Sequence, residues 1–333
     1  MPAPGLDILA LGNAIVDILS QTDERFLQEQ GLAKGTMALI DEARAEALYG
    51  LTGPSTVVSG GSAANTAVGA AMLGARAGYV GKVRNDELGR LFAHDLKAVG
   101  IDFDTPAATA GPATARSFVL VTPDGERTMN TYLGACTGLG PSDIPEATAV
   151  SAAIVYIEGY LWDAPAAKDA IRGAIAAAHG AGNKVALSLS DPFCVDRYRD
   201  EFRALLADGS LDILFSNSHE LTSLYQTADL EAALAGLREE KALGVVTRSA
   251  EGALVVSRDG TEAVPAFPVE RVVDTTGAGD LFAAGFLAGL AKGLDGRGCA
   301  RLGALAAAEV ISHIGARPQA DLADLARREG LLD

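Results

Sequence analysis

The sequence contains little cysteine, and its three cysteines lie far apart in the chain. Cys136, Cys194 and Cys299 are odd in number, and none of them is part of a CxxC pair. A disulfide framework and a zinc site both need paired or clustered cysteines, so neither is expected. Free thiols in a reducing cytoplasm are the simpler interpretation.

Basic clusters and long apolar runs are also missing. The chain carries 27 Lys and Arg against 43 Asp and Glu, a formal net charge of −16, and it has no Lys/Arg run. Nucleic acids and anionic membranes are bound through basic patches, so neither partner is expected. No apolar run reaches the roughly 18 residues of a membrane-spanning helix, and the N-terminus lacks the pattern of a signal peptide. We therefore expect a cytoplasmic protein.

Two common nucleotide-binding motifs are absent as well. The chain has no GxxxxGK[ST] sequence, and GAG at residues 277–279 lacks the third glycine of GxGxxG. A Rossmann dehydrogenase would need that fingerprint early in the chain, where GNA at residues 12–14 offers only a fragment. These absences disfavour P-loop enzymes and dinucleotide-dependent dehydrogenases.

Short apolar runs typical of strands alternate with alanine-rich helical patterns along most of the chain. The predicted strands are 6–11, 77–80, 153–157, 185–189, 212–215 and 243–246, and the predicted helices are 61–73, 87–99, 166–179, 277–290 and 301–313. Apolar strands that alternate with helices indicate a parallel sheet covered on both faces. The predicted fold class is α/β, a three-layer helix–sheet–helix sandwich with a mostly parallel sheet.

Two segments depart from this pattern and predict a small β-rich lid. The first has strand-like pieces at 16–20 and 36–40 around a short polar helix at 23–30. The second has two alternating runs that flank TPDG at residues 122–125, a hairpin turn. The predicted domains are a large α/β domain of residues 1–14, 59–111 and 135–333, and a lid of residues 15–58 and 112–134.

The most informative segment reads DTTGAGDLFAAG, at residues 274–285. The small residues Gly277, Ala278 and Gly279 open a predicted helix, so their backbone N–H groups can point together at an anion. Such a site suits a phosphoryl group whose charge grows during transfer. Asp280, the next residue, can accept the proton of an attacking hydroxyl. The alternative is an ordinary helix start with an acidic residue in its first turn.

Polar residues also follow four of the predicted strands. In an open parallel sheet, ligands bind beyond the carboxyl ends of the strands, so these side chains predict a single crevice. They are Asn13, Asp17, Glu158, Asn217, Glu220, Thr247 and Arg248.

Four motifs, in this order along essentially the whole chain, resemble the ribokinase-like (PfkB) family of carbohydrate and nucleoside kinases. GGSAANTA at residues 60–67 is similar to the family's N-terminal signature, and DTTGAGDLFAAG to its C-terminal one. Between them, NSHE at 217–220 resembles the NxxE motif, and VVTRSAEGA at 245–253 resembles the nucleotide-binding loop. The resemblance implies the ribokinase-like fold and transfer of the γ-phosphoryl group of ATP to a hydroxyl. Asp280 would be the base, and residues 277–279 would form the anion site.

The resemblance also implies which residues hold the substrate. Carboxylate and amide groups can bind neighbouring hydroxyls, and glycines permit close approach of a ligand. A strand-end turn for Asp17 and a helix cap for Asn65 are the alternatives. Glu158 matches a carboxylate that ribokinase-type members use against the substrate. The residues that match the family's sugar-binding positions are Asn13, Asp17, Gly60, Gly61 and Asn65.

The nucleotide and its metal ion are expected near the middle motifs. Asn217 and Glu220 lie one helical turn apart, and oxygen donors at this spacing suit Mg²⁺, held through its retained waters. A capping box, in which the two residues close the start of a helix, is the alternative. Ser249 stands where the family usually has glycine. The positions that match nucleotide-binding residues are Asn217, Thr247, Arg248, Gly252 and Gly279.

Two further expectations rest on the resemblance. Arg127, on the second strand of the hairpin, would swing over the phosphates as the lid closes, as in adenosine kinases; an exposed hairpin arginine is the alternative. A K⁺ site beside the anion site would use Asp274, Thr276 and Gly315.

The resemblance is strongest to the adenosine-kinase branch, in GNAIVD at 12–17 and SLSDPF at 188–193. The expected substrate is therefore a nucleoside or sugar, with the 5′-hydroxyl of adenosine first. Glu158 favours the alternative of a free-sugar kinase for ribose, fructose or 2-keto-3-deoxygluconate. The non-kinase alternative is a nucleotide- or sugar-binding regulator on the same fold. The expected assembly is a monomer or a lid-mediated homodimer.

A purine base would need an apolar slot between sheet and lid. Tyr160 and Trp162 follow a strand end, where an aromatic face can stack on a purine, although core packing is the alternative for both. The candidates for this slot are Met37, Leu39, Tyr160 and Trp162.

Overall fold

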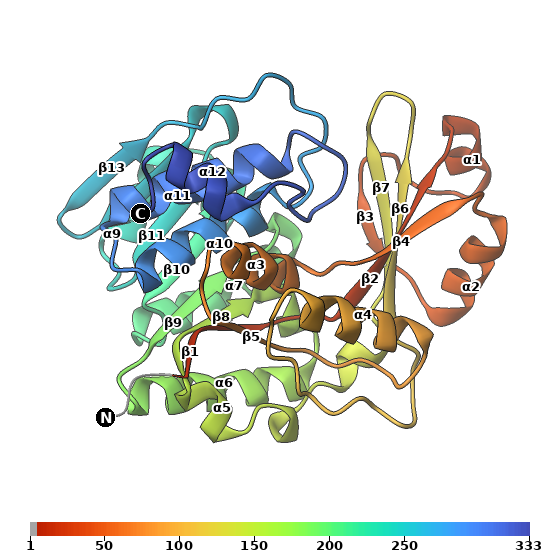
Figure 1. The fold of residues 1–333 in the computed structure, drawn as a ribbon, viewed down its shortest axis with the longest axis horizontal. Coiled ribbons are helices and arrows are strands. Elements are labelled where there is room, and N and C mark those ends of the chain that lie inside the picture. Colours follow the sequence, from red (N-terminus) through yellow and green to blue (C-terminus); the bar gives the residue numbers. More distant parts are fainter. Residues whose placement is uncertain (1–4) are drawn as a thin grey trace.

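In the part of the chain that the structure describes, eight strands form the central sheet (Figure 1). The computed structural model describes residues 5–333. The strand order is β13-β12-β11-β10-β9-β8-β1-β5, parallel from β5 to β11 and antiparallel at β12 and β13. The strands are β1 (Leu6–Leu11), β5 (Ala77–Val80), β8 (Ala152–Glu158), β9 (Lys184–Ser188), β10 (Ile213–Asn217), β11 (Leu243–Thr247), β12 (Ala253–Ser257) and β13 (Gly260–Val264).

Helices cover both faces of this sheet. The first face carries α3 (Ser62–Met72), α4 (Glu87–Ala98), α10 (Ala278–Ala291), α11 (Gly296–Val310) and α12 (Leu322–Arg328). The second carries α5 (Glu146–Val150), α6 (Pro165–Gly180), α7 (Pro192–Ala207), α8 (Ser218–Leu224) and α9 (Leu230–Arg238). This is the three-layer α/β fold that the sequence predicts.

Alternation along the central strands explains why their buried middle positions are apolar. In β8, Ile154 and Tyr156 pack into the core on one face, whereas Val155 and Ile157 pack into the core on the other. Successive strand residues point to opposite faces, so a strand covered on both sides must be apolar at every position. The two faces thus have separate hydrophobic cores.

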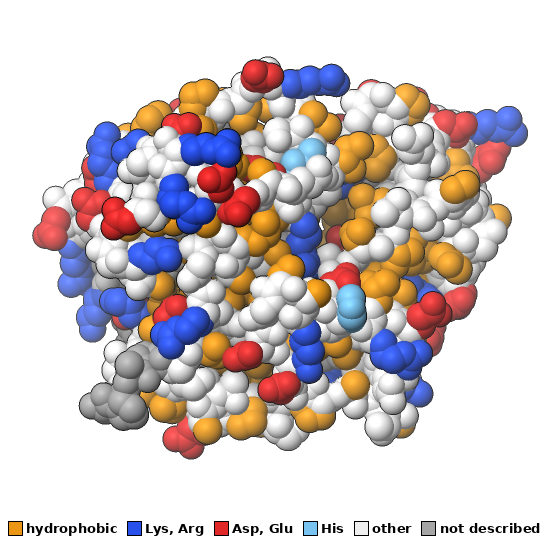
Figure 2. Space-filling view, in the orientation of Figure 1, with side chains coloured by type: hydrophobic (Ala, Val, Ile, Leu, Met, Phe, Trp, Pro, Cys, Tyr) orange, Lys and Arg blue, Asp and Glu red, His pale blue; other side chains and the backbone are white. Residues whose placement is uncertain are grey.

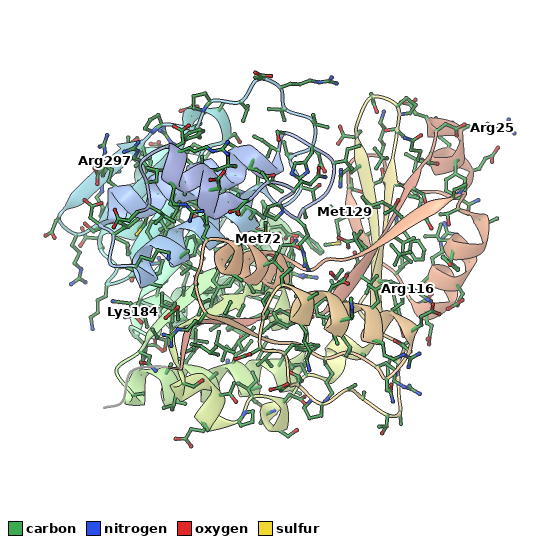
Figure 3. The ribbon with its side chains drawn as sticks, viewed as in Figure 1. Arg25, Met72, Arg116, Met129, Lys184 and Arg297 are labelled. Carbon is green, nitrogen blue, oxygen red and sulfur yellow. The ribbon has the colours of Figure 1, made fainter. Side chains whose placement is uncertain are left out.

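A second sheet stands beside the large domain, and we call it, with its helices, the lid (Figure 1). Its order is β3-β7-β6-β2-β4, and its members are β2 (Ile15–Gln21), β3 (Met37–Leu39), β4 (Ser55–Ser59), β6 (Ala115–Val121) and β7 (Arg127–Tyr132). Helices α1 (Glu24–Glu29) and α2 (Glu42–Leu51) cover its outer side, where Figure 3 places Arg25. A small core that includes Ile18, Leu48 and Phe118 holds these layers together.

The last long helix differs from its predicted range of 301–313. It begins at Gly296, because the Asp295 side chain accepts a hydrogen bond from the Gly298 N–H at 2.7 Å and so caps the first turn. It ends at Val310. The glycines at 296 and 298 hide this start from a pattern search, since glycine is a poor helix former.

The described residues also contain four short 3₁₀ helices, at Gly134–Gly138, Pro141–Asp143, Gly159–Asp163 and Ser249–Glu251. Across residues 5–333, no helix is long and apolar enough to cross a membrane. The three cysteines are free and buried. Acidic and basic side chains are interspersed over the face seen in Figure 2.

Candidate active site

Helix α10 begins with an N-terminus that no side chain closes. Its N-cap residue, Gly277, has a φ of 80° and makes no side-chain capping bond. A Cβ there would lie 2.8 Å from the Cα of Ala316, so only glycine fits both the backbone and the neighbouring loop. The first turn of α10 therefore presents backbone N–H groups and the positive end of the helix dipole without a capping side chain.

The Asp280 carboxylate lies in this first turn and is held by helix α3. Its Oδ1 accepts a hydrogen bond from Ser62 Oγ at 2.6 Å, and its Oδ2 accepts one from Asn65 Nδ2 at 3.0 Å. Thr66 Oγ1 donates to the Asp280 carbonyl at 3.1 Å. Burial raises the pKa of Asp280, while the two side-chain hydrogen bonds act in the opposite direction. An oriented carboxylate with a raised pKa suits proton acceptance.

A residue that the sequence did not single out stands behind Asn65. Arg317 Nε donates to Asn65 Oδ1 at 2.9 Å, across 252 residues of sequence. Arg317 follows Gly315 and Ala316 in the loop that was predicted only for a K⁺ site. An arginine in this loop was the available signal in the sequence. Nothing in the sequence linked that arginine to Asn65.

Asp17 and the two glycines before α3 are predicted to bind the sugar. Burial raises the pKa of Asp17 to about 7, although the nearby Arg317 and Arg127 guanidiniums lower it. Gly61 is the N-cap of α3, with a φ of 88°, and a Cβ there would lie 2.4 Å from the Asn13 carbonyl oxygen. The Gly60 N–H donates to the Ile15 carbonyl at 2.8 Å.

Glu158 is 1% exposed, and its carboxylate accepts three hydrogen bonds from neighbouring protein groups. Its Oε1 accepts from the Asn13 N–H at 3.3 Å and from Asn13 Nδ2 at 3.0 Å, and its Oε2 accepts from the Ala63 N–H at 2.9 Å. Burial raises the pKa of Glu158 to about 7, against the effect of these donors. Glu158 therefore orients Asn13 and the start of α3.

Arg127 reaches from the lid to the loop before α10. Its guanidinium forms an ion pair with Asp274. Asp274 also accepts from the Gly315 N–H at 2.7 Å and from the Thr276 N–H at 3.0 Å. The structure thus brings the residues predicted for a K⁺ site together. The carboxylate among them already faces a guanidinium, so a cation bound directly to Asp274 would have to replace Arg127.

Asn217 and Glu220 form the capping box that was the alternative to a metal site. Asn217 Oδ1 accepts from the Glu220 N–H at 2.9 Å, and Glu220 Oε2 accepts from the Asn217 N–H at 2.9 Å. Asn217 Nδ2 also donates to Glu220 Oε1 at 2.6 Å. Burial raises the pKa of Glu220 to about 7. The remaining carboxylate lone pairs fit a contact to a metal ion through water, but no direct ligand set is built here. Nor do residues 5–333 contain any group of three or more His, Cys, Asp or Glu side chains suited to a metal.

The predicted nucleotide loop follows β11. Thr247 pairs in register with Asn217 of β10, so the two predicted nucleotide residues are neighbours. Arg248 forms an ion pair with Glu251 at 3.0 Å. Ser249 has a φ of 52°, a left-handed conformation that explains why glycine is usual at this position. The loop therefore keeps the expected turn at a cost of about 1–2 kcal/mol in backbone strain.

The aromatic candidates for a purine slot separate into two kinds. Trp162 is 1% exposed and packs against Phe202, with its ring centroid 5.2 Å away. Its predicted place in the slot is wrong, because the side chain belongs to the core of the second sheet face. Tyr160 instead lines a cavity of about 180 Å³ together with Asn13, Leu133 and Cys136.

Met37 and Leu39 lie on β3 at the edge of the lid sheet, and the Leu39 side chain is 44% exposed. Leu39 lines a second cavity that shares Leu133 and Thr137 with the one beside Tyr160. In Figure 3, Met129 of the neighbouring strand β7 lies on the side of the lid that faces the large domain. Tyr160 and Leu39 thus remain candidates for the base slot.

The predicted site residues form two groups. One surrounds Asp280 through direct hydrogen bonds from α3 and the contacts of Asn13 with Glu158. The other lies at the carboxyl ends of β10 and β11, where Asn217 and Thr247 are paired. Glu158, Asn217 and Thr247 are each the last residue of a parallel strand. They therefore share one edge of the sheet, as the sequence predicts.

Comparison with known proteins gives consistent matches. The family model described as pfkB family carbohydrate kinase matches residues 50–322. A crystal structure of adenosine kinase from Sinorhizobium meliloti is 51% identical, covers 97% of this chain and 99% of that chain, and has a TM-score of 0.93. A probable sugar kinase from Rhizobium etli is 48% identical, covers 99% and 100%, and has a TM-score of 0.95. An ATP-dependent ribose-1-phosphate kinase from Halopiger xanaduensis is 33% identical over 69% of this chain and 72% of its own length.

Proposed function

This chain belongs to the pfkB family of carbohydrate kinases and is a phosphotransferase that acts on a hydroxyl group, and we propose that its acceptor is the 5′-hydroxyl of adenosine. Kinases of this family use ATP as the donor. The observation that carries the catalytic part of the proposal is the Asp280 carboxylate, held by Ser62 and Asn65 in the open first turn of α10.

In this proposal Asp280 takes the proton of the acceptor hydroxyl while the hydroxyl oxygen attacks the γ-phosphorus. The new P–O bond forms as the bond to the β-phosphate oxygen breaks, and ADP leaves. The N–H groups of residues 277–279 stabilise the charge on the transferring group. Arg127 reaches this region from the lid, where it excludes water and adds positive charge as the lid closes.

The sugar-side residues support a furanose whose primary hydroxyl faces Asp280. Asp17 and Asn13 offer carboxylate and amide groups for ring hydroxyls. The missing Cβ atoms of Gly60 and Gly61 make room for the Asp17 carboxylate and the Asn13 carbonyl, and so help to place both residues. Asn65 already donates to Asp280, so it links the sugar side to the proposed base.

Two observations favour a nucleoside over a free sugar. The first is the 51% identity to a protein described as an adenosine kinase, over nearly the whole chain. The second is that Glu158 already accepts three hydrogen bonds from Asn13 and the Ala63 N–H, which leaves less of its acceptor capacity for a sugar hydroxyl. The cavity beside Tyr160 and Asn13 is the proposed place of the base.

A free-sugar kinase, for ribose, fructose or 2-keto-3-deoxygluconate, is the second candidate. It is supported by the similarity to a probable sugar kinase. The 33% identity to a ribose-1-phosphate kinase adds a phosphorylated pentose to the acceptors worth testing.

We place the nucleotide along β10 and β11, with Asn217 and Thr247 beside it and Arg248 and Gly252 shaping the loop. When Mg²⁺ is bound with the nucleotide, it neutralises charge on the phosphates, and Asn217 and Glu220 would hold it through water. No step is assigned to K⁺, because Arg127 faces Asp274. Equal rates in K⁺ and tetramethylammonium buffers would remove the K⁺ site altogether.

The substrate is tested by steady-state competition with ATP. We expect adenosine to have the highest kcat/KM in a panel with ribose, ribose 1-phosphate, fructose and 2-keto-3-deoxygluconate. A sugar with a kcat/KM well above that of adenosine would overturn the nucleoside proposal. The kinase activity and the role of Asp280 would still stand in that case.

A further inference from the structure

Arg317 is the only cationic side chain in the described residues with a hydrogen bond to Asn65, whose amide nitrogen donates to Asp280. It lies in the loop after α11, next to Ala316, which packs against Gly277 at the start of α10. Its Nη2 is buried and has no hydrogen-bond partner within residues 5–333. The guanidinium is therefore held in the site by the bond from its Nε to Asn65 Oδ1, at 2.9 Å.

The chemistry of the three groups sets the orientation of the Asn65 amide. A guanidinium can only donate hydrogen bonds, and an ionised carboxylate can only accept them. The amide oxygen must therefore face Arg317 and the amide nitrogen must face Asp280, as the distances of 2.9 Å and 3.0 Å show. Without Arg317, the Asn65 amide would lose the partner that fixes this orientation.

We infer that Arg317 is a positioning residue for the reaction: through Asn65 it holds the Asp280 carboxylate in place. The inference rests on the proposed role of Asp280 as the base. It assigns no direct contact between Arg317 and the substrate.

The charges around Asp280 make the effect of Arg317 measurable. Burial raises the pKa of Asp280, and the Arg317 guanidinium lowers it. Arg317 also lowers the pKa of Asp17. The charged and titratable groups that face this region are Asp17, Tyr79, Asp95, Arg127, Tyr156, Glu158, Asp280 and Arg317. Four of them are carboxylates, so the loss of one cation raises the pKa of Asp280 further.

The test is the pH dependence of turnover in Arg317→Gln. We expect kcat near neutral pH to fall by about 10-fold or more, since an unpositioned base works poorly. The acidic limb of the kcat profile should move to higher pH, because a carboxylate without its neighbouring cation loses its proton less readily. Activity should therefore recover partly as the pH is raised.

Two variants separate positioning from a structural role. Arg317→Lys keeps the positive charge but lacks the planar guanidinium. Its pH profile should therefore lie close to that of the wild type, whereas its kcat should recover less fully. Arg297→Gln is the matched control: Arg297 forms an exposed ion pair with Glu262 and lies on the side of the large domain away from the lid (Figure 3). Its kcat and pH profile should equal those of the wild type.

A double mutant tests the route through Asn65. In an Asn65→Ala background, Arg317→Gln should lower kcat by a smaller factor than it does alone, because the link is already broken. Equal factors in both backgrounds would overturn the positioning role.

The inference also fails if Arg317→Gln has the kcat and pH profile of the wild type. It fails too if kcat falls equally at all pH values together with a lower melting temperature, since that pattern indicates a folding defect alone. Asp280→Asn distinguishes this failure from that of the proposed function. If Asp280→Asn turns over normally, the base assignment is wrong whatever Arg317 does.

Discussion

Helices α8 and α10 differ in how their first turns are closed. Helix α8 is capped by its own residues, because Asn217 and Glu220 satisfy each other's backbone N–H groups at 2.9 Å. Helix α10 has Gly277 as its N-cap residue, and glycine has no side chain that could close the first turn. The first arrangement stabilises a helix, whereas the second leaves donors for a ligand.

The acidic residues of the two first turns differ in the same way. Glu220 and Asp280 are both buried enough that their pKa values are raised. The hydrogen bonds to the Glu220 carboxylate come from Asn217, within its own capping box. Those to Asp280 come from Ser62 and Asn65 of another helix. The Asp280 carboxylate is positioned by another helix and is available for the reaction. The Glu220 carboxylate mainly stabilises its own helix.

The largest effect is expected from Asp280→Asn, which removes proton acceptance and keeps the shape. We expect kcat to fall by on the order of 10²–10⁴-fold, with KM changed little, because the base acts in the transition state. The measurement is steady-state kinetics with ATP and the best acceptor. Asp295→Asn is the matched control, since Asn caps a helix as well as Asp does and should leave turnover unchanged. Near-normal turnover of Asp280→Asn would mean that Asp280, like Glu220, is not the base of the reaction.

The second effect concerns the open N-terminus itself. Gly277→Ala places a methyl group 2.8 Å from Ala316 at a φ of 80°, so the first turn of α10 must shift. We expect kcat to fall by on the order of 10²-fold, because a displacement of about 1 Å in a positioned group costs that much. Stability should fall by about 1–2 kcal/mol from the strained backbone, measured by urea unfolding.

The other end of α10 supplies the control. Gly293 has a φ of 81°, but a Cβ there would meet nothing within 4 Å. Gly293→Ala should therefore cost similar strain and leave kcat unchanged. If Gly277→Ala and Gly293→Ala lose activity alike, the loss reflects backbone strain alone. The open N-terminus of α10 would then have no particular role in turnover.

Much of the site follows from the sequence because its signals are local. The small residues before Asp280 and the polar residues at strand ends can each be recognised within a few positions. Ser249 is a further case: a family position that usually holds glycine adopts a φ of 52° here. The fold follows for the same reason, since strands covered on both faces are apolar at every position.

The features of the site that the sequence did not predict depend on contacts between distant segments. The link from Arg317 to Asn65 spans 252 residues, and no periodicity or motif announces it. Trp162 follows a strand end, as a ligand-stacking aromatic would, yet it turns into the core beside Phe202. Which way a strand-end side chain points is decided by the packing of neighbouring helices, and the sequence of one segment does not contain that information.

The smallest expected effect tests whether the cap of α8 also serves the nucleotide. Glu220→Gln keeps an acceptor for the Asn217 N–H, because Gln also completes a capping box, but it removes the negative charge. If Glu220 holds Mg²⁺ through water, the Mg²⁺ concentration for half-maximal rate should rise by roughly 10-fold, as for other outer ligands of metals. Stability should change little, in contrast to Asn217→Ala, which removes the cap and should cost about 1 kcal/mol. The measurements are a Mg²⁺ titration of the rate at saturating ATP and urea unfolding of both variants. If the Mg²⁺ titration of Glu220→Gln equals that of the wild type, Glu220 only caps α8. Helix α8 would then have no part in the reaction, in contrast to α10.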